Sequence, residues 1–106
     1  MVGCFLGAGD RWAFPPAKQQ ALEARFGPYR RDVADFRTEE LERVLGELDG
    51  MREQHFAMAR AVLTEDQPDF LMMVEMGPDR LHHAMWQHMD PAHRAYRAGN
   101  PWEARA

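Results

Sequence analysis

Apolar residues recur at helical spacing through the middle of the chain. From Thr38 onward they return every three or four positions, which is the pattern of one face of an amphipathic helix. The positions are Leu41, Val44, Leu45, Leu48, Met51, Ala59, Val62 and Leu63. The Thr38 hydroxyl suits the N-cap, and the acidic residues after it suit the positive end of the helix dipole. We therefore predict a long helix within residues 38–64, weakened by about 1 kcal/mol at each of Gly46 and Gly50, where a bend is expected.

A shorter helix is predicted before the long one. Residues 17–26 place their apolar side chains on one side of a helix, and Pro15-Pro16 suits its first turn. Gly27-Pro28 then provides a stop signal.

The run of residues 70–76 shows no alternation of polar and apolar positions. Such a run is typical of a strand that is covered on both faces, as in a parallel sheet. Residues 2–6 and 33–36 are weak candidates for neighbouring strands. A short helix over residues 80–88 should follow. We therefore expect an α/β fold, a helix-rich part of a larger α/β sandwich with one long helix and one buried core strand.

These elements divide the chain into segments of one incomplete domain, residues 1–106. They are a loop or frayed end (1–14), a short helix and extended segment (15–37), a long helix (38–64), a strand–loop–helix unit that carries the candidate metal ligands (65–93) and a polar tail (94–106).

Composition narrows the classes of function. Hydrophobic residues make up 45% of the 106 residues and the net charge is −4, so the chain is compatible with folding. No basic stripe exists to pair with phosphates, which argues against nucleic-acid binding, and no apolar run is long enough for a membrane span. Cys4 is the only cysteine. An intrachain disulfide is thus excluded, and we predict a cytoplasmic protein.

Asp79 and His83 are candidate metal ligands because they lie four positions apart on a predicted helix. That spacing puts both side chains on one face, with Cβ atoms about 6 Å apart. A carboxylate oxygen and an imidazole nitrogen are ordinary zinc ligands, although two ligands alone hold zinc poorly. The alternative is that Asp79 caps its helix and His83 packs against the strand. Three further histidines are expected at the surface: His82, His88 and His93.

The chain offers few hydroxyl groups that could act as a catalytic nucleophile. It contains no serine, and its only threonines are Thr38 and Thr64. Neither threonine lies in a strand-to-helix turn of the kind that presents a nucleophile.

Several segments in order resemble the type I phosphodiesterase/nucleotide pyrophosphatase branch of the alkaline phosphatase superfamily. The resemblance covers most of residues 12–103 and is strongest from Asp69 to His83. The segments are Arg25-Phe26-Gly27-Pro28-Tyr29, Asp32-Val33-Ala34-Asp35-Phe36-Arg37-Thr38, Asp69-Phe70-Leu71-Met72-Met73-Val74-Glu75-Met76-Gly77, Asp79-Arg80-Leu81-His82-His83, Met89-Asp90-Pro91 and Gly99-Asn100-Pro101.

The resemblance implies a two-zinc hydrolase on a large α/β sheet, in which Asp79 and His83 are two ligands of one zinc. Pro78 departs from the small or hydroxyl-bearing residue that relatives often have there. The Thr or Ser nucleophile of the family and its Asp-His-Gly segment are missing. We therefore expect a fragment of a phosphoester hydrolase that is inactive alone and is either truncated or split from a partner chain that carries the missing part. Two alternatives remain open: a helical interaction module that binds a partner or forms a homo-oligomer, and a small zinc protein that adds one more histidine.

Overall fold

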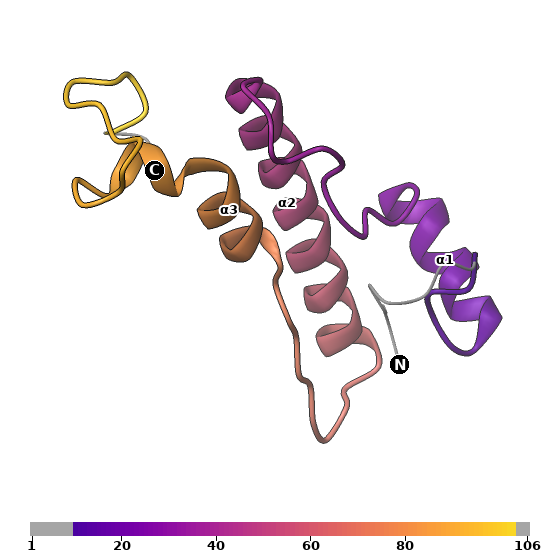
Figure 1. Cartoon of the computed structure of the whole chain (residues 1–106). Helices are drawn as coiled ribbons and strands as arrows, with labels where there is room; N and C mark the ends of the chain where they lie inside the picture. Colours follow the sequence, from indigo (N-terminus) through magenta and orange to yellow (C-terminus); the bar gives the residue numbers. More distant parts are fainter. Residues whose placement is uncertain (1–9, 104–106) are drawn as a thin grey trace. The chain divides into compact units, whose positions relative to one another are not determined.

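The computed structural model describes residues 10–103, which form three α-helices joined by loops (Figure 1). Helix α1 runs from Pro16–Phe26, α2 from Leu41–Glu65 and α3 from Gly77–Met89. None of these helices is long and apolar enough to cross a membrane. Residues 2–6, one of the two candidate strands, and Cys4 lie outside the described residues.

The chain packs as two compact units. The first unit contains residues 10–32 and 50–75, and the second contains residues 33–49 and 76–103. Helix α2 therefore contributes its carboxyl-terminal part to the first unit and its amino-terminal part to the second.

The two predicted amphipathic helices are confirmed. Helix α1 has proline in its first turn and ends where Gly27 adopts φ +79°, a conformation that glycine reaches without steric cost. Helix α2 is assigned without interruption through Gly46 and Gly50. Thr38 lies in the turn before α2, where its hydroxyl accepts a hydrogen bond from the Glu40 backbone N–H at 3.3 Å.

The expected α/β fold with a buried core strand is wrong. No segment within residues 10–103 forms a strand or a sheet. Residues 70–76 have no regular secondary structure and are largely exposed, since Phe70 keeps 77% of its surface accessible, Met72 74% and Val74 63%. In Figure 1 they form the loop that returns from the end of α2 to the start of α3.

The physical reason is the absence of partners for this strand. A strand is stabilised by backbone hydrogen bonds and side-chain contacts from its neighbours, and no backbone hydrogen bond joins residues 70–74 to another part of the described chain. The candidate neighbour at residues 33–36 contains a turn, with Asp35 at φ +47°. An apolar composition alone therefore did not bury the run.

The first unit has a small aromatic core. Trp12, Leu22 and Met58 are buried together, and Tyr29 packs against them with its ring stacked on Trp12 at 4.4 Å between centroids. The Trp12 indole N–H donates a hydrogen bond of 2.6 Å to Glu23 on α1. The buried indole therefore has a hydrogen-bond partner for its N–H group, as buried tryptophans usually do.

The second unit buries side chains from α2, α3 and the loop before α2. They are Val33, Leu41, Val44, Leu48, Ala84 and Met85. Arg43 ties the loop to α2, because its guanidinium donates to Glu40, Glu47 and the backbone carbonyls of Ala34 and Asp35. These contacts fix the loop that carries Phe36 and Arg37 beside α3.

Candidate metal site on α3

Asp79 and His83 both lie in the first two turns of α3. The helix begins at Gly77, with Pro78 in the first turn and Met76 at the N-cap position. Proline is tolerated there because the first backbone N–H groups of a helix have no partner within it. Asp79 is therefore a helical residue and not the N-cap, and the alternative in which it only caps its helix is wrong. The four-residue spacing therefore places the Asp79 and His83 side chains on one face of the helix.

The two side chains converge on each other. Nε2 of His83 lies 3.7 Å from Oδ1 of Asp79, and each side chain keeps about half of its surface accessible, 48% and 49%. Zinc binds nitrogen and carboxylate oxygen at about 2.0–2.1 Å, so two tetrahedral ligands lie about 3.3 Å apart. The observed separation is close enough for small side-chain rotations to reach that value. The pair fits two ligands of a zinc ion.

Arg80 and Phe36 support this pair from the side. The Arg80 guanidinium lies 2.7 Å from Oδ2 of Asp79 and 4.7 Å from the centre of the Phe36 ring. The same ring lies 5.9 Å from the His83 imidazole. Since Arg80 occupies Oδ2, Asp79 has Oδ1 left for a metal ion. No sequence pattern indicated these contacts, because Phe36 lies in a loop more than forty residues before Asp79.

The other histidines of the second unit do not join the pair. His82 is exposed and makes an edge contact with Trp86 at 5.5 Å. His93 accepts a hydrogen bond from the Ala95 backbone N–H. His88 has its Nε2 atom 3.2 Å from the side-chain amide nitrogen of Gln87. No group of three or more metal-ligating side chains occurs within residues 10–103. Within the part of the chain that the structure describes, Asp79 and His83 therefore form a pair that no third ligand completes.

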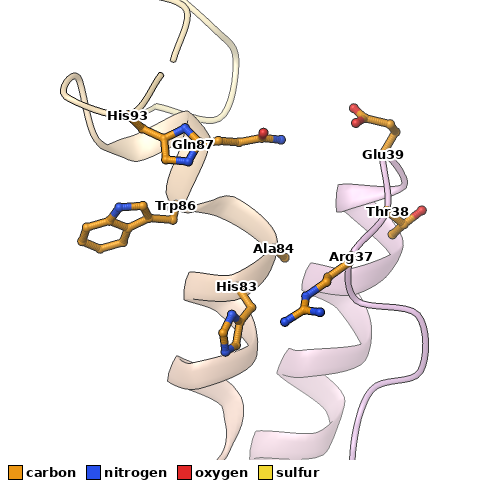
Figure 2. Close-up of a pocket in the computed structure, with 8 residues that line it drawn as sticks. All are labelled: Arg37, Thr38, Glu39, His83, Ala84, Trp86, Gln87 and His93. Carbon is orange, nitrogen blue, oxygen red and sulfur yellow. The ribbon is translucent and has the colours of Figure 1, made fainter. Parts of the chain in front are cut away.

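An open pocket of about 370 Å³ lies next to His83 (Figure 2). Its lining residues are Arg37, Thr38, Glu39, His83, Ala84, Trp86, Gln87 and His93. Figure 2 shows the Arg37 side chain extending from its loop toward α3, on which His83 lies. The pocket thus combines one guanidinium group with hydrogen-bonding side chains beside a candidate metal ligand.

His55 on α2 is a polar residue that the sequence analysis did not single out. It is 9% exposed, and both of its ring nitrogens face acceptor atoms. The available signal was its position between Met51 and Met58, at helical spacing on the buried face of α2.

Comparison with known proteins does not assign the chain to a family. No protein-family model matches it, and no match was found among the curated proteins or the solved structures.

Proposed function

We propose that this chain supplies two ligands of one zinc ion, Asp79 and His83, to a cytoplasmic phosphoester hydrolase. The observation that carries the proposal is the 3.7 Å approach of Oδ1 and Nε2 on one exposed face of α3. It is supported by the resemblance of residues 69–83 to the type I phosphodiesterase branch of the alkaline phosphatase superfamily. In this proposal a further part of the enzyme carries the nucleophile, the remaining zinc ligands and the ligands of the second metal ion.

Each group near the pair has a role that follows from its position. Asp79 and His83 hold a cation between them, and Arg80 keeps the carboxylate turned toward His83 through its contact with Oδ2. Arg37 brings a permanent positive charge to the adjoining pocket, which suits an anionic phosphoester. A zinc ion in such a site supplies Lewis-acid polarisation of a phosphoryl oxygen.

The proposal predicts that the isolated chain does not hydrolyse phosphoesters. Hydrolysis needs a nucleophile and a complete metal site, and the chain has no serine and no third ligand within its described residues. Activity should appear only when a second chain provides both.

A complementation assay tests this proposal. The chain is mixed with the products of neighbouring genes, one of which carries a Thr or Ser nucleophile segment, and bis-p-nitrophenyl phosphate hydrolysis is measured with zinc. We expect activity only in the mixture, lost with a chelator and with His83→Ala. His82→Ala is the matched control, since His82 faces Trp86, and should retain activity. Hydrolysis that survives His83→Ala, or no hydrolysis in any mixture, contradicts the proposal.

One observation favours a second candidate function, a helical interaction module. Phe70, Met72 and Val74 expose most of their surface in a single segment, and exposed apolar clusters mark protein contacts. Light scattering across protein concentrations, with and without chelator, separates the two functions. A mass that rises with concentration and ignores chelator, together with no zinc binding at His83, favours the interaction module.

A further inference from the structure

The pocket beside α3 has two walls that come from different parts of the second unit. The loop that carries Arg37, Thr38 and Glu39 forms one wall, and α3 with His93 beyond its end forms the other (Figure 2). The pocket volume of about 370 Å³ lies within the range of about 300–1,000 Å³ in which proteins bind small molecules. The pocket is therefore large enough for a small organic ligand.

The loop wall of the pocket is held in place by contacts within the second unit. The Arg43 guanidinium donates to the backbone carbonyl oxygens of Ala34 and Asp35 at 3.3 and 3.2 Å. The Phe36 ring lies 5.9 Å from the His83 imidazole on α3. These contacts hold the loop to α2 and to α3 just before the pocket begins. A ligand then does not have to order the loop, which lowers the entropic cost of binding.

Arg37 supplies a cation that other side chains leave available. Its guanidinium lies 5.6 Å from the centre of the Phe36 ring, and no hydrogen bond or ion pair joins it to another residue of the chain that the structure describes. Figure 2 shows it directed toward α3, whereas the Glu39 carboxylate is directed away from it. Since a guanidinium forms paired hydrogen bonds with the oxygens of an anion, Arg37 can meet an anion inside the pocket.

Neutral hydrogen-bond donors surround the same space. The Thr38 oxygen accepts a hydrogen bond of 3.3 Å from the Glu40 backbone N–H, so its hydroxyl proton remains available to donate. The Nδ1 atom of His93 accepts a hydrogen bond of 3.2 Å from the Ala95 backbone N–H, which leaves the ring proton on Nε2. Gln87 adds an amide group from α3. The pocket thus offers donors from three segments of the chain.

We propose that this pocket binds the phosphate group of a small phosphate monoester and that Arg37 selects it. Such a phosphate group carries about two negative charges and three terminal oxygens at neutral pH, which match one guanidinium and donors from three segments. A carboxylate has one charge and two oxygens, so it satisfies fewer of these donors. Binding needs neither zinc nor a second chain, and the inference therefore goes beyond the proposed function.

A titration of the full chain with phenyl phosphate, followed by nitrogen-15 NMR in the presence of a chelator, tests this inference. We expect saturable shifts of the backbone signals at residues 37–39 and 83–87. Benzoate has the same ring with a carboxylate, and it should bind at least about tenfold more weakly, because it lacks at least one charge-assisted hydrogen bond. The chelator removes zinc, so the response does not depend on Asp79 and His83 as metal ligands.

Arg37→Gln is the decisive variant because it removes the charge and keeps a polar side chain. Arg37 is exposed, so the variant should fold, and its affinity for phenyl phosphate should fall at least about tenfold. Arg37→Lys keeps the charge without the paired hydrogen bonds, so it should lose less affinity than Arg37→Gln. Arg97→Gln is the matched control and should bind as the wild-type chain does, because Arg97 is an exposed arginine of the second unit that does not line the pocket.

Four results would each overturn the inference. They are shifts that rise without saturation, equal affinities for benzoate and phenyl phosphate, an Arg37→Gln variant that binds as the wild-type chain does, and an equal loss with Arg97→Gln. Failure of the zinc proposal is a separate result, since it appears in a zinc titration and not in the presence of a chelator. Saturable binding of phenyl phosphate that depends on Arg37 supports the site whether or not zinc binds.

Discussion

Replacing Met85 by alanine should lower the free energy of unfolding by about 3 kcal/mol, whereas the same replacement at Met72 should cost less than about 0.6 kcal/mol. Met85 is fully buried and Met72 is 74% exposed. The change removes three heavy-atom groups, each worth about 0.8 kcal/mol when buried, and a cavity adds to that at Met85. Because Met72 is 74% exposed, its side chain contributes only about a quarter of the burial energy that Met85 contributes.

Urea unfolding followed by far-UV circular dichroism measures both costs. A third variant, Met85→Leu, nearly preserves volume and should cost less than about 1.5 kcal/mol, which separates cavity formation from a general sensitivity of the site. Had residues 70–76 been a buried strand, Met72→Ala would cost as much as Met85→Ala. Equal costs would therefore refute the exposed position of this segment.

Three further changes test particular features of the fold. Gly46→Ala should raise the free energy of unfolding by about 1 kcal/mol, because α2 gains a better helix former and no atom lies within 4 Å of the new Cβ; urea midpoints check this. Gly27→Ala should lower it by about 1 kcal/mol, because φ +79° strains any residue with a side chain, and a neutral result would contradict the role of Gly27 as a stop. Burial and then Glu75 raise the pKa of Tyr29, so its protonated form stabilises the fold below about pH 10 and that stability is lost as the pH rises further. An ultraviolet titration of the Tyr96→Phe variant checks this, and a phenol that ionises at its ordinary pKa contradicts it.

The helices could be predicted from the sequence because their signals are local. The recurrence of apolar residues from Leu41 to Leu63 and the stop at Gly27 depend on neighbours within a few positions. The apolar run at residues 70–76 could not be assigned in the same way. Burial of a strand depends on which segments pair with it, and no local pattern states that. Composition was therefore a poor guide to its exposure.

The candidate site likewise contains one feature that the sequence predicts and others that it does not. Asp79 and His83 could be paired from their spacing once a helix was expected there, because that spacing fixes their shared face. The support of Asp79 by Arg80 and Phe36 depends on tertiary packing, so it had no signature in the sequence. His55 was overlooked for a related reason. A single histidine on the apolar face of a helix usually packs in the core, and its hydrogen-bond partners cannot be read from the sequence.

Binding of zinc by Asp79 and His83 is best measured by a zinc titration of the full chain that follows the histidine ring signals in NMR spectra. We expect zinc to shift the His83 ring signals first and Asp79→Ala to weaken this response at least about tenfold, since even the loss of a group that only hydrogen-bonds to a metal ligand lowers metal affinity about 10–100-fold. A zinc response that is equal at His82 and His83, or one that Asp79→Ala leaves unchanged, would contradict it.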